Sequence, residues 1–142
     1  MNQANNNGVT PLLVACYKGH AEVVTKLLAA NASVNQATND GCTPLYIASW
    51  EGHTELVIQL LAANASVDEP ENDGFTPLYV ASQNGYTEVV TKLLAANASV
   101  NQATNDGATP LLMASGKGHT EVVTMLIAAN AAVDQALSLI HI

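Results

Sequence analysis

Basic residues are scarce in this 142-residue chain, which has four lysines, no arginine and twelve acidic residues. Its formal net charge is therefore -8 with neutral histidines. A protein that binds nucleic acid needs a surface stripe of lysine and arginine, because phosphate contacts supply much of the binding free energy. We therefore expect no nucleic-acid partner. The acidic balance leaves two interpretations open, a merely solvated surface or one that attracts basic partners.

Long apolar runs and cysteines are also few. No run approaches the roughly 20 apolar residues that a membrane-spanning helix needs, and the first seven residues lack the basic and apolar regions of a secretory signal. We therefore expect no membrane association and an intracellular, cytoplasmic location. Cys16 lies in a helical pattern and Cys42 beside a turn glycine. They are predicted to be free thiols in a reducing compartment.

What the chain does have is one phrase that occurs four times. A turn glycine, a Thr-Pro pair and a second glycine each recur every 33 residues, as the step from position 41 to position 74 shows. The members are Gly8, Gly41, Gly74 and Gly107; Thr10, Thr43, Thr76 and Thr109; and Gly19, Gly52, Gly85 and Gly118. A fixed period of this length predicts stacked repeats rather than one globular core.

The second unit shows what each repeat is expected to form. Thr43 can cap a helix whose first residue is proline, and Gly52 stops it, so a short helix is predicted from about Pro44 to Glu51. A second helix is predicted from about Thr54 to Ala63. It ends at an asparagine in the left-handed conformation, a position filled by Asn31, Asn64, Asn97 and Asn130. Such short helices are marginal alone, so we predict an all-α solenoid in which neighbouring units stabilise one another.

These residues resemble the ankyrin repeat. The shared pattern is Asp-Gly-x-Thr-Pro-Leu, then alanine, then Gly-His-x-Glu-Val/Leu-Val, then Leu-Leu, and it covers about Asn7 to Gln135. The resemblance implies helix-turn-helix units joined by extended β-turn loops in a single domain over residues 1–142. The units then fall at about 7–39, 40–72, 73–105 and 106–136, followed by an apolar tail at 137–142.

The chain departs from the ankyrin pattern at three places. The histidine that usually follows Thr-Pro-Leu is replaced by Leu13, Tyr46, Tyr79 and Leu112. This replacement removes the hydrogen-bond network that the histidine usually makes between units. Asparagine replaces the glycine that usually closes the second helix. The aspartate that usually opens the turn limb is Thr38, Glu71 and Thr104. We therefore expect less rigid turns than the family norm.

The ends of the array are also expected to be unusual. The first unit is predicted to lack a turn limb before Asn7, and the last runs into the apolar segment Leu137 to Ile142. Solenoid ends normally carry polar outer faces, so we expect a piece of a longer array. The alternative is that the tail folds back over the last helix pair or associates between molecules. Glu22 to Gly41 is identical to Glu88 to Gly107, which indicates either recent duplication or a designed consensus.

No catalytic or metal-binding constellation emerges from the repeats. Equivalent histidines, such as His20 and His53, are separated by stacking over about 8 to 10 Å, whereas zinc ligands converge to about 2 Å from one ion. Serines such as Ser49 fall on a buried helix position with no histidine or aspartate spaced to activate them. The acidic loop 68–73 lacks the calcium-loop spacing. We predict no enzyme activity, no cofactor and no metal.

Variation between units marks the candidate binding surface. Second-helix positions hardly change, but the residue after the turn glycine and the two before the second glycine differ between units. By resemblance to ankyrin repeats, these turns and first helices line a concave groove that binds other proteins. The predicted protein-binding residues are Tyr17, Lys18, Cys42, Tyr46, Trp50, Glu51, Asn72, Asp73, Phe75, Tyr79, Gln83 and Asn84.

The only tryptophan and the only phenylalanine, Trp50 and Phe75, stand in such places. They would be exposed unless a partner covers them, as aromatic hot-spot anchors are covered. For Trp50 the alternative is packing along its own and the next first helix, and Tyr46 and Tyr79 can equally be half-buried between units. The predicted function is non-catalytic binding of a protein partner. The alternative is a structural scaffold or designed array without a specific natural partner, which self-associates weakly through its ends.

Overall fold

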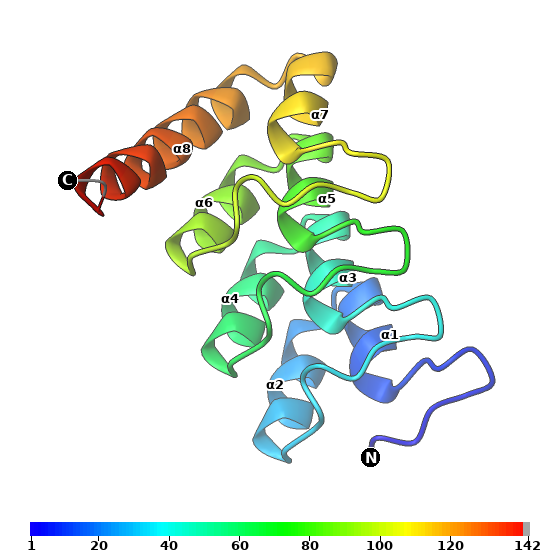
Figure 1. Cartoon of the computed structure of the whole chain (residues 1–142). Coiled ribbons are helices and arrows are strands. Elements are labelled where there is room, and N and C mark those ends of the chain that lie inside the picture. Colours follow the sequence, from blue (N-terminus) through cyan, green and yellow to red (C-terminus); the bar gives the residue numbers. More distant parts are fainter. Residues whose placement is uncertain (141–142) are drawn as a thin grey trace.

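A computed structural model describes residues 1–140 of the chain and the side chains of residues 1–130. The described residues form eight helices and no strand. The helices are α1 (Pro11–Lys18), α2 (Ala21–Ala29), α3 (Pro44–Glu51), α4 (Thr54–Ala62), α5 (Pro77–Asn84), α6 (Thr87–Ala95), α7 (Pro110–Lys117) and α8 (Thr120–Ile140). Figure 1 shows the odd-numbered helices stacked in one layer and the even-numbered helices in another. The predicted all-α solenoid is confirmed, and none of the described helices combines the length and hydropathy that a bilayer span requires.

Each odd-numbered helix begins and ends at the predicted signals. In α5, the Thr76 hydroxyl accepts a hydrogen bond from the backbone N–H of Tyr79 at 3.1 Å, and Pro77 occupies the first helical position. Gly85 ends the helix with a φ of 72°, a left-handed conformation that glycine adopts without a Cβ clash. The other three odd-numbered helices repeat this arrangement. The Thr-Pro pair and the second glycine therefore fix the same short helix in every unit.

The second glycine of each of the first three units also receives an aromatic ring from the next unit. A Cβ added to Gly52 would lie 2.9 Å from the ring of Tyr86, the residue that precedes α6. The same close approach joins Gly19 to the His53 ring and Gly85 to the His119 ring. Glycine is thus needed twice here, for its left-handed φ and for the space that the ring fills. The histidines in the inter-helix turn therefore act as contacts between units.

The even-numbered helices contribute apolar side chains to a core that they share with the odd-numbered helices. Val57 and Leu60 of α4 and Val90 and Leu93 of α6 are fully buried between the layers. The helices α2, α4 and α6 are each followed by an asparagine with a φ of 65° or 66°, namely Asn31, Asn64 and Asn97. At these three positions the predicted left-handed end is confirmed.

The fourth unit does not end as predicted. Asn130 lies inside α8, which continues to Ile140, so the left-handed end predicted at Asn130 is wrong. Ala131 and Ala132 follow it where the other units have Ala-Ser, and alanine has the highest helix propensity. Leu139 and Ile140 stand where the 33-residue period would place the next Asp-Gly pair. Residues 137–140, predicted as part of an apolar tail, continue α8 in the same direction and do not fold back (Figure 1). The last two residues of the predicted tail, 141–142, lie outside the described part of the chain.

Side-chain oxygens hold the turn limbs in shape. Glu71 Oε1 accepts hydrogen bonds from the backbone N–H groups of Asp73 at 2.7 Å and Phe75 at 3.0 Å. The hydroxyls of Thr38 and Thr104 each accept one such bond, at 3.1 Å. The residues that replace the usual aspartate therefore still bond the turn.

The first unit also has a turn limb, contrary to the prediction. Asn5 Oδ1 accepts hydrogen bonds from the backbone N–H groups of Asn7 at 2.9 Å and Val9 at 3.0 Å. The backbone N–H of Gly8 also donates to the carbonyl of Asn5 at 3.0 Å. Asn5 here accepts the same two bonds that Glu71 accepts in the turn that opens the third unit.

A row of asparagines ties the turn tips of successive units together. The side-chain amide of Asn39 donates to the carbonyl of Asn6 at 2.9 Å. Equivalent bonds run from Asn72 to Asn39 at 3.3 Å and from Asn105 to Asn72 at 3.1 Å. We call these three bonds the asparagine ladder. They fix the spacing of the turn tips beside the odd-numbered helices (Figure 1).

Candidate binding groove

Two hollows adjoin on the odd-numbered helices of the first two units. One has a volume of about 220 Å³ and is lined by Tyr17, Tyr46, Ile47, Trp50 and Glu51. The other has a volume of about 390 Å³ and is lined by Val9, Leu13, Val14, Tyr17, Lys18, Thr38 and Ile47. Because they share Tyr17 and Ile47, they form one depression, which we call the groove. Most of its lining side chains are apolar or aromatic.

Tyr17 and Trp50 form the exposed walls of the groove. Their exposed fractions are 54% and 40%. The Trp50 ring stacks on the buried ring of Tyr46, with 6.3 Å between centroids and 26° between planes. On the other wall, Lys18 Nζ lies 5.5 Å from the Tyr17 ring centroid, within the range of a cation–π interaction. Trp50 therefore packs along its own helix on one side and still presents ring surface to solvent.

Phe75 and Tyr79 lie deeper than the sequence indicated. Tyr79 is only 3% exposed and Phe75 is half-buried, and their rings stack with 5.0 Å between centroids and 11° between planes. Together with Tyr46 and Val80 they form a small core cluster. Burial raises the pKa of the Tyr79 phenol, and the Asp106 charge raises it further. Tyr79 therefore supports the surface from beneath and offers a partner little contact area.

The turn-tip candidates differ in how far their side chains are already engaged. Asn72 is exposed, but its amide donates within the asparagine ladder. The Asp73 carboxylate is exposed and accepts no hydrogen bond within the described residues. Cys42 is half-buried, and burial raises the pKa of its thiol although a hydrogen bond with Thr38 opposes the shift. Of these three, Asp73 has the side chain most available to a partner.

The candidates Gln83 and Asn84, at the end of α5, are half-buried and connect units. The side-chain amide of Asn84 donates to the carbonyl of Trp50 at 3.0 Å. The carbonyl of Gln83 accepts a hydrogen bond from His119 Nε2 at 2.9 Å. Asn84 therefore links α5 to the backbone beneath the Trp50 wall.

Sequence reasoning missed Ile47 and Val14, which complete the apolar lining. They occupy equivalent positions in α3 and α1, one residue after Tyr46 and Leu13. A signal was present, because Leu45 to Trp50 is apolar around nearly the whole helix except for Ser49. A helix with one buried face needs only one apolar stripe, so the excess indicates exposed apolar surface.

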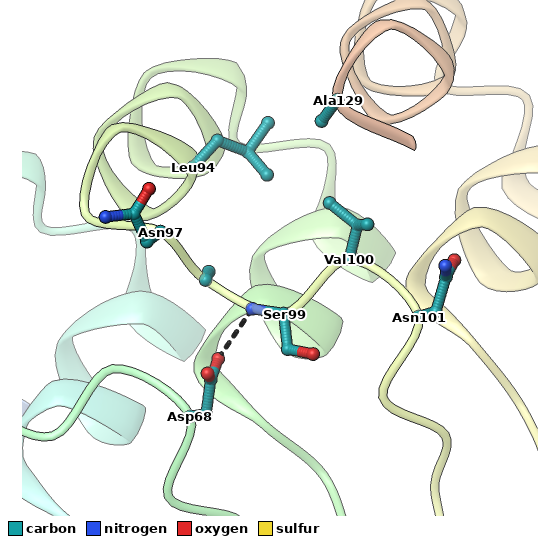
Figure 2. A pocket seen from close by; sticks show the side chains of 8 residues that line it. Asp68, Leu94, Asn97, Ser99, Val100, Asn101 and Ala129 are labelled. Carbon is teal, nitrogen blue, oxygen red and sulfur yellow. Dashed lines mark hydrogen bonds between the residues drawn. The ribbon is translucent and has the colours of Figure 1, made fainter. Parts of the chain in front are cut away.

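A third hollow lies away from the groove, between the end of α6 and α8 (Figure 2). Its volume is about 580 Å³, and its lining residues are Asp68, Leu94, Asn97, Ala98, Ser99, Val100, Asn101 and Ala129. Figure 2 shows Asp68 accepting a hydrogen bond from the backbone N–H of Ser99 at 2.8 Å. This carboxylate of the acidic loop therefore joins one inter-unit loop to the next.

Comparison with known proteins identifies the family to which this architecture belongs. The family model described as ankyrin repeats (3 copies) matches residues 1–71 and 52–136. The chain belongs to the ankyrin-repeat family. A search among curated proteins found no match. Ankyrin repeats are generally protein–protein interaction modules and are typically non-catalytic.

The reactive side chains of this ankyrin-repeat chain are dispersed. Within the described residues, no three histidine, cysteine or acidic side chains come together as a metal site. Cys16 and Cys42 are free thiols. Burial raises the pKa of Cys16 to about 12, so its thiol stays protonated and a poor nucleophile near neutral pH. The groove of the ankyrin-repeat array offers aromatic and apolar contact beside one carboxylate, that of Glu51, and one ammonium group, that of Lys18.

Proposed function

We propose that this ankyrin-repeat chain is a non-catalytic protein-binding module whose partner contacts the groove. The observation that carries this proposal is the pair of exposed rings, Tyr17 and Trp50, on either side of Ile47. Interface hot spots combine aromatic anchors, apolar hollows and polar rims in this way. The buried Tyr46 ring supports Trp50, so little ordering entropy is lost when a partner binds.

The chemistry of the groove rim favours a basic partner segment. Glu51 lines the groove, and the charges of Glu71 and Asp73 lie close enough to raise the pKa of Tyr46 beyond the effect of burial. The chain as a whole carries a formal charge of -8. We infer that the partner presents an apolar side chain flanked by lysine or arginine, because complementary charge speeds encounter and selects register.

Affinity capture with matched variants tests the groove. Trp50→Ala removes one wall and is expected to weaken partner binding by about 2 kcal/mol or more, a hot-spot magnitude. Ile58→Ala is the matched control, because Ile58 is 44% exposed but lies on α4 in the other layer. Both variants should give the circular dichroism spectrum of the parent.

The three proteins then serve as baits for a lysate of the source organism, and retained proteins are titrated by calorimetry. The proposal expects proteins that bind the parent and Ile58→Ala but are lost by Trp50→Ala. If Trp50→Ala binds every retained protein as tightly as the parent, the groove is not the binding site.

We also propose an intracellular, cytoplasmic site of action. The two free thiols support it, since reducing compartments preserve unpaired cysteines. Imaging of a fluorescent fusion in the source organism tests the location, and fluorescence confined to a secretory compartment would contradict it.

A further inference from the structure

A row of carboxylates runs along the turn tips beside the groove. Asp40, Asp73 and Asp106 each stand one residue before the turn glycine of their unit, and all three are exposed. Within the described residues, none of the three carboxylates accepts a hydrogen bond. The first unit has a neutral residue, Asn7, at the equivalent position. We call the three aspartates the acidic row.

No lysine lies among the turn tips to neutralise the acidic row. The four lysines all lie in the last turns of helices, and they are Lys18 in α1, Lys26 in α2, Lys92 in α6 and Lys117 in α7. Lys18 lines the groove, but it ends α1, whereas the turn limb precedes the start of this helix. The turn tips therefore carry charge of one sign, and a basic partner complements it.

The acidic row lies on the same side of the array as the groove. Burial raises the pKa of both Tyr46 and Tyr79, and the nearby charge of Asp73 raises the first further, as that of Asp106 raises the second. Tyr46 lines the groove. The groove also reaches the turn limb, because Thr38 is among its lining residues. One partner segment can therefore contact the groove and the acidic row together.

Hydrogen bonds between turn tips give the acidic row a regular spacing. The backbone N–H of Asn72 donates to the carbonyl of Asp40 at 3.0 Å. The next pair, Asn105 and Asp73, is joined in the same way at 3.0 Å, beside the asparagine ladder. The turn tips therefore follow the step of the stacked helices, roughly 8 to 10 Å per unit.

A proline-rich segment repeats at nearly the same step. In the polyproline II conformation every third side chain lies on the same face, and three residues rise about 9 Å. A β-strand, by contrast, turns every third side chain to its opposite face. Polyproline II segments dock in aromatic-lined grooves, and Tyr46 and Trp50 give this groove such a lining. An amphipathic helix needs a longer stripe of apolar anchor sites, whereas the groove spans only the first two units.

We propose that the partner segment is a proline-rich stretch in the polyproline II conformation with lysine or arginine at every third position. This inference rests on the proposed function, because it specifies what the groove binds. The basic side chains pair with Asp40, Asp73 and Asp106. An apolar residue three positions before or after the basic series enters the groove beside Ile47. The neutral Asn7 fits this register, because the acidic row ends where the groove begins.

A labelled synthetic peptide, Leu-Pro-Pro-Lys-Pro-Pro-Lys-Pro-Pro-Lys, tests the proposal by fluorescence anisotropy at low ionic strength. The reversed order is tested beside it, because either chain direction places the lysines on the acidic row. A second peptide of the same composition has its three lysines adjacent at one end, and a third has glycine in place of each proline. These two should bind about threefold or more weakly, because one misplaces the charges and the other must be ordered on binding.

Two protein variants of equal net charge test the acidic row. Asp40→Asn combined with Asp73→Asn removes two of its charges, and the natural Asn7 shows that asparagine suits this place in the turn. Glu55→Gln combined with Glu88→Gln is the control, because both glutamates are exposed in the first turns of α4 and α6. The aspartate variant should bind the peptide about fivefold or more weakly than the control. The control should bind like the parent, and added sodium chloride should weaken both.

A comparison with Trp50→Ala separates this inference from the proposed function. That variant should also bind the peptide weakly, because the leucine loses a wall of the groove. If Trp50→Ala weakens binding and the aspartate variant does not, the inference is overturned and the groove stands. If only the aspartate variant weakens binding, both the inference and the proposed function are contradicted. The inference also fails if neither peptide order binds the parent, or if the adjacent-lysine or glycine peptide binds as tightly.

Discussion

Two serine hydroxyls are buried without a hydrogen-bond partner among the described residues, those of Ser49 and Ser82. An unsatisfied buried hydroxyl costs about 1 to 3 kcal/mol. We predict that Ser49→Ala and Ser82→Ala each raise the free energy of unfolding by about 1 kcal/mol, measured by urea denaturation. Ser115→Ala, at the exposed equivalent position, should change stability little. A loss of stability in Ser49→Ala would contradict this account.

The buried thiol of Cys16 predicts a loss of stability in alkali. Burial raises its pKa from 9.0 to about 12, so the neutral thiol stabilises the fold fully below pH 9.0 and this stabilisation is lost as pH rises. Between these pKa values the thiol alone removes about 1.4 kcal/mol per pH unit. Tyr46, whose pKa is also raised from 10.0 by burial, should add to the fall at higher pH.

Urea denaturation from about pH 8 to about pH 11 measures this slope. Cys16→Ala should fall less steeply than the parent, whatever its absolute stability, while retaining the part due to Tyr46 and Cys42. Parallel curves for parent and variant would show that the Cys16 thiol does not titrate as described.

At the scale of the helix ends, substitutions at two glycines distinguish the cost of backbone strain from the cost of disturbing a contact between units. Gly52 and Gly118 have φ values of 75° and 76°, but only Gly52 faces a ring, that of Tyr86 at 2.9 Å from an added Cβ. We predict that Gly118→Ala costs about 1 to 2 kcal/mol from left-handed strain alone. Gly52→Ala should cost about 1 to 3 kcal/mol more, because the ring must shift.

The difference between these two variants, measured by thermal and urea denaturation, reports the ring contact. Equal losses would mean that the Tyr86 ring moves aside freely. A larger loss in Gly118→Ala would contradict the assignment of open space at that position.

The helix boundaries were predictable because their signals are local. Thr43, Pro44 and Gly52 act on groups within one helical turn, so no knowledge of the neighbours was needed. Asn130 was not predictable from the same pattern. A left-handed asparagine ends a helix only if the following loop is held, and here α8 continues instead.

The residues of the groove were predictable only in part. The exposure of Trp50 was predictable, because it is a bulky residue at a position that varies between units. The structure leaves its side chain 40% exposed. The burial of Tyr79 was not predictable, because Tyr79 belongs to a cluster that includes Tyr46 of the unit before it and Met113 of the unit after it. Ile47 was missed because only the residue after the turn glycine and the two residues before the second glycine were compared between units, and Ile47 lies between these positions and lines the groove.

At the scale of the whole molecule, inner units pack against two neighbours and end units against one. In such arrays stability is close to a sum of unit and interface contributions. We predict that amide hydrogen exchange is slowest in α3 to α6 and faster in α1, α2 and α7. Hydrogen exchange followed by mass spectrometry measures this. Uniform protection across the array would contradict it.

The acceptors of the asparagine ladder belong to the main chain. Each bond joins an amide in one unit to a carbonyl in the unit before it, and that carbonyl persists whatever residue carries it. Replacing Asn72 therefore removes its own bond to Asn39 and leaves the bond from Asn105 in place. A substitution at Asn39, Asn72 or Asn105 therefore removes one bond of the ladder and never two. Substitutions can therefore accumulate at these asparagines one unit at a time, while the remaining bonds of the ladder keep the spacing of the other turn tips.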